Sequence, residues 1–257
     1  MDESKPQIDD RDVIDSFARG LQVIEAFSDE HVRLTPSEAA RLTGMTRTAA
    51  RRYLLTLVRH GYADTDGKLF WLTPRVMRLS QSYLEAARLP RLVQPFIQRI
   101  SMQSGETVNV SVLDGHEVVY VARSSAPRGV SIGYQAGVRV PAHVVAPGIV
   151  MLSAMADDVL DSWIDAHAFG NFTSFTVTDR QDFRRVVLSA RAQNHWITAQ
   201  QFDLGLCGVA MALKNRKGEL QGAISMTVQT QAYNEEQVAQ RLLPLLQDTA
   251  QTLRALL

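Results

Sequence analysis

The first third of the chain alternates apolar and polar residues with the period of an α-helix. Between residues 13 and 27 the apolar side chains recur three or four positions apart, which predicts a first helix. A second helix is predicted at the stretch TPSEAARL. There Thr35 is an N-cap candidate, Pro36 suits the first helical position, and Glu38 completes a capping box.

The third predicted helix carries two different faces. It follows a turn at Gly44, is capped by Thr46 and ends near His60. At about 100° per residue, apolar side chains gather on one side, and cations with one threonine gather on another side roughly 120° away. No acidic residue occurs between Glu38 and Asp64. The apolar face comprises Ala50, Leu54, Leu57 and Val58, and the basic face comprises Arg47, Thr48, Arg51, Arg52 and Arg59.

Two helices joined by a short glycine-containing turn, the second of them basic, are typical of a helix-turn-helix that docks in the major groove of DNA. A carboxylate on that face would repel phosphates, whereas arginine and threonine can reach phosphate oxygens and base edges. The alternative is a solvated basic face. Two β-prone runs around Asp66-Gly67 then predict a hairpin, and therefore a winged helix with Lys68 at the wing tip. The predicted DNA-binding residues are Thr35, Ser37, Thr46, Arg47, Thr48, Arg51, Arg52 and Lys68.

The pattern changes after residue 73. A helical stretch over residues 74–88 is interpreted as a linker helix with room for dimer contacts, and one more core helix is the alternative. Period-two alternation then predicts a hairpin around Asp114-Gly115. Further strands are expected at 129–134, 195–200, 207–214 and 219–228, and helices at 147–156, 157–167, 180–193 and 235–256.

Strands and helices mixed in this way indicate an α+β domain built on an antiparallel sheet. We therefore expect a winged helix-turn-helix domain over residues 1–73, a linker helix over 74–89 and a second domain over 90–257.

The composition fits a globular protein of a reducing compartment. Apolar residues make up 46% of the chain, and the formal net charge is zero, so no global field draws it to nucleic acid or to a membrane. The charge is uneven, because residues 11–91 hold 13 lysines and arginines against 9 acids. A single cysteine, Cys207, excludes an internal disulfide framework. No signal peptide is apparent and no stretch reaches the roughly 18 apolar residues of a spanning helix, so a cytoplasmic location is expected.

No catalytic motif is supported by its surroundings. The stretch GVSIG matches the G-x-S-x-G pattern at Ser131, but it continues an alternating strand, whereas a nucleophile elbow needs a helix directly after the serine. The six histidines show no metal-ligand spacing, and no dinucleotide or Walker loop occurs. Taken alone, His143 and Cys207 fit packing residues. No cofactor and no metal are therefore predicted.

Two features favour a small-ligand pocket in the second domain. A Pro-Gly step opens the apolar helix in VPAHVVAPGIVMLSAM, so main-chain N–H groups near Ala146, Gly148 and Ile149 can face an anion. A helix that merely starts in the core is the alternative. Ser225 and Thr227 alternate on a strand and point to one side, which suits a carboxylate or hydroxyl ligand, although ordinary polar surface explains them equally well.

The order of these motifs resembles the IclR family of bacterial transcription regulators over nearly the whole chain. The resemblance rests on SFARGLQVIEAF, LTPSEAARLTGMTRTAARRYLLTLVRHGY, GKLFWLTPRVMRL, GETVNVSVLDGHEVVYVAR, GLCGVAMALKNRKGELQGAISM and a closing leucine-rich helix. TRTAARRYLLTLV and DGHEVVYVAR look like the branch that responds to aromatic-acid catabolites such as protocatechuate and 4-hydroxybenzoate. The resemblance implies a winged helix-turn-helix, a linker helix and a GAF-like effector domain, assembled as homodimers or tetramers on palindromic operators.

The resemblance also implies roles for single residues. On the recognition helix it implies base or phosphate contacts by Thr46, Arg47, Thr48, Arg51 and Arg52. For the effector it implies Ile132, Tyr134, Val140, Ala146, Pro147, Thr198, Gly208, Ser225 and Thr227, and the predicted effector-binding set also includes His143, Gly148, Leu206 and Cys207. The chain departs from the family's usual pattern where Pro147 removes an N–H donor and where Ile149 stands in place of a cation. It departs again where Cys207 follows Gly-Leu.

The sequence therefore predicts a homo-oligomeric repressor or activator of a catabolic operon. Its partners would be double-stranded DNA and a small organic acid, aromatic by the resemblance, and no membrane. The effector would shift the relative placement of two DNA-binding domains, and it can do so only by the free energy with which it prefers one arrangement. An esterase using Ser131, or a winged-helix adaptor that binds protein, are the alternatives from other classes.

Overall fold

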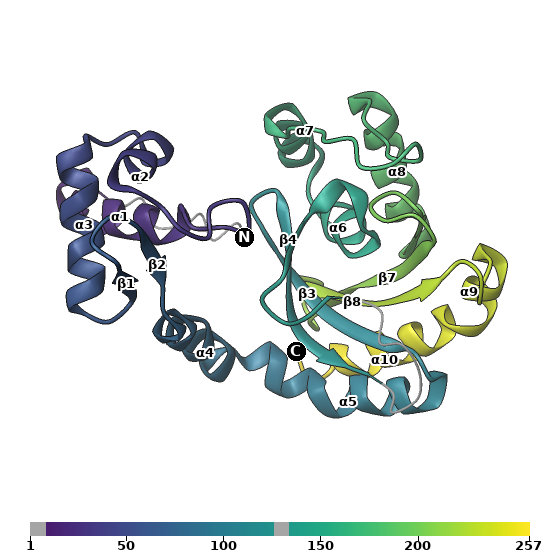
Figure 1. Cartoon of the computed structure of the whole chain (residues 1–257). Coiled ribbons are helices and arrows are strands. Elements are labelled where there is room, and N and C mark those ends of the chain that lie inside the picture. Colours follow the sequence, from purple (N-terminus) through teal and green to yellow (C-terminus); the bar gives the residue numbers. More distant parts are fainter. Residues whose placement is uncertain (1–8, 126–133) are drawn as a thin grey trace. The chain divides into compact units, whose positions relative to one another are not determined.

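The computed structural model describes residues 9–125 and 134–257 of the chain (Figure 1). The chain divides into two compact units, one up to Tyr83 and one from Leu84 onward. Each unit has a hydrophobic core of its own, so each is described by itself. In the described residues no helix is long and apolar enough to cross a membrane.

The N-terminal unit is built on three helices, after a short 3-10 turn η1 (Asp10–Asp12). They are α1 (Asp15–Glu25), α2 (Pro36–Thr43) and α3 (Arg47–Arg59). The capping box predicted at the start of α2 is confirmed: the Thr35 hydroxyl accepts from the Glu38 N–H, and the Glu38 carboxylate accepts from the Thr35 N–H. Gly44 ends α2 in the left-handed conformation at φ 67°, which lets the chain turn into α3. The core between the helices holds Val23, Leu34, Ala39, Ala40, Ala50, Leu54 and Phe70.

A two-stranded wing follows α3. Strand β1 (Ala63–Thr65) pairs antiparallel with β2 (Phe70–Leu72), as the sequence predicted. The Asp66 carboxylate accepts the N–H groups of Lys68 and Leu69, at 2.9 and 2.7 Å, and so closes the turn. A bridge between Leu34 and Phe70 ties the wing to the start of α2.

The helical stretch after the wing contains more breaks than the sequence indicated. It begins as a 3-10 turn, η2 (Pro74–Val76), and continues as α4 (Met77–Ala86). Helix α5 (Arg88–Ser104) starts before Pro90, because a proline in the first turn of a helix leaves no N–H unsatisfied. The break between α4 and α5 therefore falls at Ala87.

The C-terminal unit is organised by one antiparallel sheet in the order β5-β4-β3-β8-β7-β6. The predicted hairpin is formed by β3 (Thr107–Asp114) and β4 (Glu117–Ser124). β5 (Arg139–Pro141) pairs with β4, and β8 (Leu220–Gln229) lies between β3 and β7 (Leu206–Lys214). β6 (Trp196–Ala199) closes the other edge.

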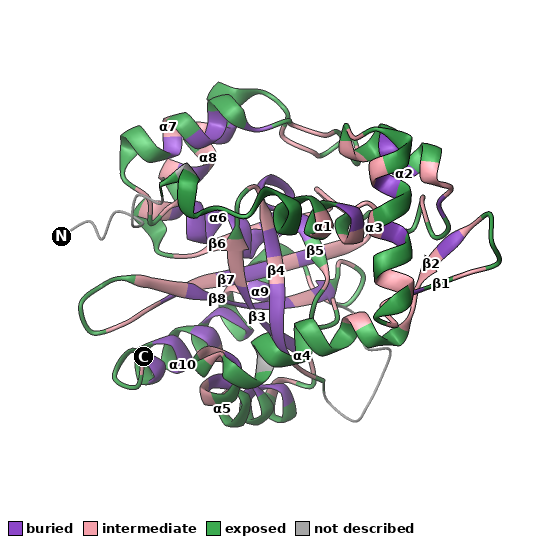
Figure 2. Cartoon of the chain, turned by 90° about the vertical axis from the view of Figure 1, so that its left-hand side faces the viewer, coloured by how far each residue is buried: buried purple, intermediate pink, exposed green. Residues whose placement is uncertain are grey.

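Helices cover both faces of this sheet (Figures 1 and 2). On one face α5 packs with α9 (Glu235–Arg241) and α10 (Leu243–Arg254). On the other face the 3-10 turn η3 (Ala142–Val144) leads into α6 (Ala146–Leu152), which is covered by α7 (Asp157–Ala166) and α8 (Arg180–Gln193). Helix α6 is buried along its whole length, so both its sequence and its position are tightly constrained.

Two elements differ from the sequence expectations, and one expected strand lies outside the described residues. The single helix expected at 235–256 is two helices that meet at Leu242, because Pro244 cannot donate a backbone hydrogen bond within a continuous helix. Strand β5 is too short to give a periodic signal, and it was not predicted. The strand expected at 129–134 and the GVSIG stretch with Ser131 lie outside the described residues, apart from Tyr134.

Candidate DNA-binding surface and ligand pocket

The N-terminal half of α3 presents its arginines to solvent. Ala50 and Leu54 are completely buried, whereas Arg47, Arg51 and Arg52 on the other side of the helix are exposed. Among the described residues, none of these three guanidinium groups has an ion pair or a side-chain hydrogen bond. An exposed and unpaired arginine keeps all its donors for an external anion such as a phosphate.

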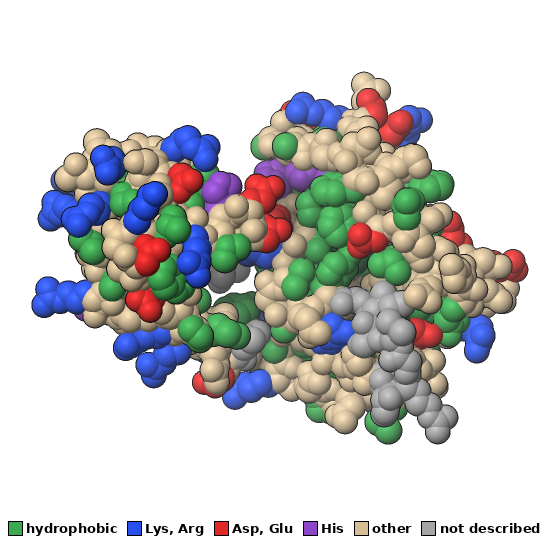
Figure 3. Space-filling view, viewed as in Figure 1, with side chains coloured by type: hydrophobic (Ala, Val, Ile, Leu, Met, Phe, Trp, Pro, Cys, Tyr) green, Lys and Arg blue, Asp and Glu red, His purple; other side chains and the backbone are tan. Residues whose placement is uncertain are grey.

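The surroundings of α3 fit this use. Thr46 caps the helix, accepting from the Ala49 N–H at 3.2 Å, and Thr48 is exposed beside it. Ser37 and the wing-tip Lys68 are exposed as well, whereas the hydroxyl of Thr35 is bonded to Glu38 within the capping box. Lysine and arginine side chains gather on the surface of this unit (Figure 3). The DNA-contact roles of the individual residues remain predictions.

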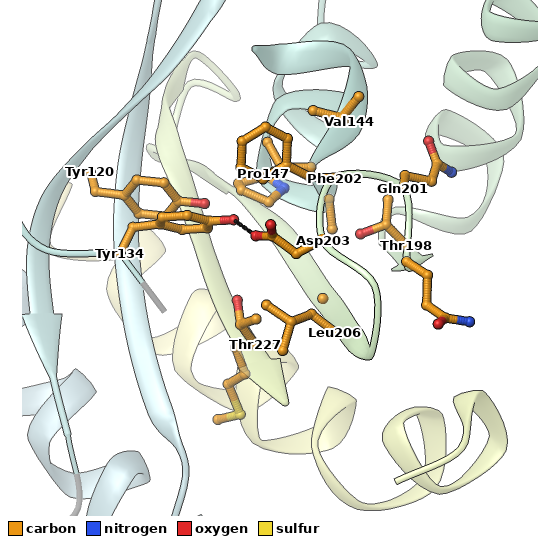
Figure 4. A pocket seen from close by; sticks show the side chains of 15 residues that line it. Tyr120, Tyr134, Val144, Pro147, Thr198, Gln201, Phe202, Asp203, Leu206 and Thr227 are labelled. Atoms are coloured by element: carbon orange, nitrogen blue, oxygen red, sulfur yellow. Dashed lines mark hydrogen bonds between the residues drawn. The ribbon is translucent and has the colours of Figure 1, made fainter. Parts of the chain in front are cut away.

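The C-terminal unit contains a pocket where α6 begins, above one end of the sheet (Figure 4). It is small, about 40 Å³. Its walls come from β4, the segment after residue 133, the start of α6, the loop 200–203 and strands β6, β7 and β8. The lining residues are Tyr120, Tyr134, Val144, Val145, Ala146, Pro147, Thr198, Gln200, Gln201, Phe202, Asp203, Leu206, Gly208, Met226 and Thr227.

Aromatic rings form one side of this pocket. Tyr120 and Tyr134 stack with ring centroids 4.9 Å apart, and Phe202 lies 6.2 Å from Tyr134. The Tyr134 hydroxyl donates to the Asp203 carboxylate at 3.1 Å (Figure 4). Burial raises the pKa of both tyrosines, and the Asp203 charge adds to the effect on the pKa of Tyr134. Both phenols are therefore neutral, and the pocket offers flat apolar surface with a few polar groups at its rim.

Seven of the residues selected from the sequence for effector binding lie together in this pocket. They are Tyr134, Ala146, Pro147, Thr198, Leu206, Gly208 and Thr227. Gly208 is placed so that a Cβ atom there would meet the Thr198 hydroxyl at 3.2 Å and the Ala146 Cβ at 3.8 Å. The absence of a side chain at this position therefore widens the pocket floor.

Five other selected residues do not line the pocket, and Ile132 lies outside the described residues. Cys207 faces the opposite side of the sheet, where it packs in the core with α5 and α10, because side chains alternate along a strand. Burial raises the pKa of its thiol to about 11, as expected for a packing residue. Gly148 has a packing role instead, since a Cβ there would lie 2.1 Å from the Ala142 carbonyl oxygen. Val140 is buried among the residues around α6, and Ser225 lies one position deeper on β8 than the pocket-lining Thr227.

His143 belongs to a chain of three histidines behind the pocket. Its Nε2 lies 3.0 Å from the Gly170 carbonyl oxygen, and its Nδ1 lies 2.8 Å from His167 Nε2. His167 Nδ1 lies 3.1 Å from His116 Nδ1. Because a carbonyl only accepts, His143 donates from Nε2 to Gly170, and in a neutral ring its Nδ1 then accepts. His167 therefore donates from Nε2 to His143 Nδ1, and His116 donates from Nδ1 to His167 Nδ1. Burial lowers the pKa of His143 and, with the two neighbouring histidines, lowers that of His167 to about 4. The described residues contain no cluster suited to a metal ion.

Several pocket residues were not selected from the sequence. Tyr120 lies between Val119 and Val121 on β4, which both pack on the α5 side, so simple alternation would have placed it on the face of the sheet opposite α5. The loop residues Gln200 to Asp203 have no periodicity, and their position depends on hydrogen bonds to a distant segment. Thr173 and Thr176 donate to the carbonyls of Gln200 and Gln201 at 2.6 and 2.7 Å.

A basic recognition helix in a winged helix-turn-helix, with a separate pocket-bearing domain on the same chain, defines a ligand-responsive DNA-binding regulator. Family comparison agrees. Residues 16–67 match the IclR helix-turn-helix domain, and residues 81–255 match the C-terminal domain of the bacterial transcriptional regulator IclR. The chain belongs to the IclR family of transcriptional regulators.

Two curated relatives align with nearly the whole chain. The chain is 38% identical to the p-hydroxybenzoate hydroxylase transcriptional activator of Acinetobacter baylyi, over 98% of the chain and 95% of that protein. It is 33% identical to the Pca operon regulatory protein of the same organism, over 99% and 93%. The inducer-binding domain of the PobR transcription factor from Acinetobacter, solved with 3-hydroxybenzoic acid, is 31% identical. It covers 66% of this chain and all of that chain, with a TM-score of 0.64. All of these are regulators of transcription and none is an esterase.

Proposed function

We propose that this regulator binds a small aromatic acid carrying a ring hydroxyl and that the ligand alters its affinity for operator DNA. The pocket with Tyr120, Tyr134 and Phe202 on one wall carries the proposal, because such rings offer a flat apolar surface to an aromatic ligand. The relatives that regulate p-hydroxybenzoate and Pca genes, and the related domain solved with 3-hydroxybenzoic acid, support the same ligand class.

The proposed functions are assigned to the three segments predicted from the sequence. Residues 1–73 bind DNA, 74–89 form the linker and 90–257 bind the effector and mediate oligomerisation. The protein acts in the cytoplasm, where bacterial operators lie. The ligand regulates the operator only if its affinity differs between two arrangements of the DNA-binding domains. The effector-binding residues are those of the selected set that line the pocket, with Tyr120 and Phe202 added.

A homodimer or a tetramer on a palindromic operator is proposed as the active form. The supporting observation is an apolar stripe on α1 and α4 that a single chain leaves exposed. Ile14 and Phe17 are 69% and 68% exposed, and Leu79 on α4 is 51% exposed. Phe17, Leu21 and Leu79 also line an apolar groove of about 340 Å³ in this unit. Exposed apolar stripes of this kind mark interfaces, and a second copy would place two recognition helices on one operator.

A panel of ligands tests the proposal. Thermal melts of the full-length protein are measured with benzoate, 3- and 4-hydroxybenzoate, protocatechuate and short aliphatic acids. The proposal expects the hydroxylated aromatic acids to raise the melting temperature, because a ligand that binds the folded state stabilises it. A shift with aliphatic acids alone would contradict the ligand class. A gel shift on the DNA upstream of the protein's own gene then shows whether the stabilising ligand changes operator binding.

A further inference from the structure

Two polar side chains in the middle of the sheet are completely buried and have no hydrogen-bond partner among the described residues. Asn109 and Ser111 lie on β3 with no solvent exposure. In the described part of the chain, neither the amide nitrogen nor the amide oxygen of Asn109 has a hydrogen-bond partner, and the same holds for the Ser111 hydroxyl. An unpaired buried amide is destabilising, so this arrangement favours a polar partner that enters from outside the chain.

The position of these groups connects them to the pocket. Val108 and Val110 pack on the α5 side, so Asn109 and Ser111 point to the α6 side, where the pocket lies. Ser225 on β8 stands directly opposite Asn109, and Tyr120 on β4 stands opposite Ser111. The pocket residues Tyr120 and Thr227 thus flank Asn109 from the two neighbouring strands.

The pocket is too small for an aromatic ligand unless part of its wall moves. Its volume of about 40 Å³ is well below the order of 150 Å³ that holds a benzene ring. An aromatic ligand must therefore displace part of the wall. Tyr120 is the wall residue opposite Ser111, so movement of its ring extends the pocket onto Ser111 and Asn109.

We propose that Asn109, together with Ser111 and Ser225, forms an inner polar subsite that binds the ring hydroxyl of the aromatic effector. This inference rests on the proposed function. A hydroxyl both donates and accepts, and so it satisfies the two ends of one amide. A carboxylate at this depth would lose its hydration, and the subsite supplies only neutral donors in return.

The nearest cation in the strand register does not change this assignment. Arg123 stands opposite Asn109 on β4, but it is half-exposed and its Nε donates to the Ser125 hydroxyl at 3.1 Å. Its Nε is therefore held beside the exposed Ser125, directly after the end of β4. The hydroxyl end of the ligand points inward in this arrangement.

The experiment compares ligands that differ only in the hydroxyl group. Affinities of 4-hydroxybenzoate, 3-hydroxybenzoate and benzoate are measured calorimetrically for the full-length wild type and for Asn109→Leu, which has a similar shape and no polar atoms. The affinity for the better-bound hydroxybenzoate should fall about tenfold or more, while the affinity for benzoate stays the same or rises. Ser111→Ala should show the same selectivity with a smaller loss.

Thr249→Val provides a matched control. Thr249 on α10 is also fully buried with an unpartnered hydroxyl among the described residues, but α10 covers the opposite face of the sheet. This variant should leave all three affinities unchanged. If Asn109→Leu does not fold in a thermal melt, Asn109→Ala carries the same comparison.

The possible failures are distinguishable. Equal losses for benzoate and the hydroxybenzoates in the Asn109 variant would overturn the subsite, and so would an unchanged hydroxybenzoate affinity. In both cases the proposed function stands, because the wild type still binds the ligand. If the wild type binds no hydroxylated aromatic acid, the proposed function fails and the subsite fails with it.

Discussion

Single residues on α3 show how a chain with no net charge can present a local group of exposed cations. Arg47, Arg51 and Arg52 are exposed and free of ion pairs with other described residues, on a stretch without acidic side chains. Several arginines elsewhere are held by acids, as Arg139 is by Asp114 and Glu117. A paired arginine has donors already in use, whereas an unpaired one keeps its donors for an external anion.

Replacement of these arginines tests their role directly. Arg47→Ala and Arg51→Ala should each weaken operator binding by about 1–3 kcal/mol, and a phosphate contact should lower the salt slope by about 1. Fluorescence anisotropy on operator DNA at several salt concentrations measures both quantities. Arg216→Ala, an exposed arginine on the β7–β8 turn, is the matched control and should bind as the wild type does. If Arg47→Ala and Arg51→Ala bind the operator as tightly as the wild type and Arg216→Ala do, these two α3 arginines do not contact the DNA.

Gly208 offers a second test at the scale of one residue. A side chain there meets the Thr198 hydroxyl at 3.2 Å and fills the pocket floor. Gly208→Ser should therefore lower the affinity for the effector about tenfold, the size expected for one added group in a tight pocket. Operator binding without ligand should not change. Calorimetric titration with the effector measures this affinity. An affinity equal to that of the wild type would show that the ligand does not bind beside Gly208.

At the scale of elements, local signals predicted most of what forms locally. The caps at Thr35, Thr46 and Gly44 bounded α2 and α3, and the Asp114-Gly115 turn with flanking valines identified the β3–β4 hairpin. The strand order was not available from these signals, because β3 pairs with β8 across more than 100 residues. The pocket depends on that pairing and on a loop anchored by Thr173 and Thr176, so its full membership could not be predicted.

The histidine chain behind α6 makes the stability of the C-terminal unit sensitive to acid. Burial and its histidine neighbours lower the pKa of His167 to about 4 in the folded state, against an ordinary value of 6.5. The unfolded chain therefore binds more protons between these values. This contribution to stability is fully present above pH 6.5 and is lost as the pH falls toward 4.

Thermal melts across this range test the linkage. The melting temperature of the wild type should fall as the pH is lowered from about 7 to 5. His167→Phe removes the titrating ring but keeps an aromatic ring beside Trp163, so part of this pH dependence should disappear. His195→Gln, at a histidine outside the chain of three, is the control and should retain the wild-type slope. The same slope in His167→Phe and the wild type would show that other groups dominate.

For the whole molecule, the exposed stripe on α1 predicts self-association. Phe17→Glu places a charge on the stripe, where the side chain is 68% exposed in a single chain, so the fold should be retained. Light scattering after size exclusion should show smaller particles than the wild type at the same concentration. Affinity for a full palindrome should fall by at least about tenfold, as expected when an apolar interface anchor is lost. An unchanged particle size would exclude this stripe as the interface.

The proposed function couples an aromatic ligand in the C-terminal unit to DNA held by α3. The most direct measurement is the operator affinity of the wild type at fixed salt across increasing concentrations of 4-hydroxybenzoate, repeated with Gly208→Ser. The operator affinity of the wild type should shift to a plateau, by about 5- to 150-fold in either direction, and Gly208→Ser should need more ligand to reach that plateau. The proposed coupling would be contradicted if the operator affinity stayed constant at every concentration of each hydroxylated aromatic acid that binds the protein.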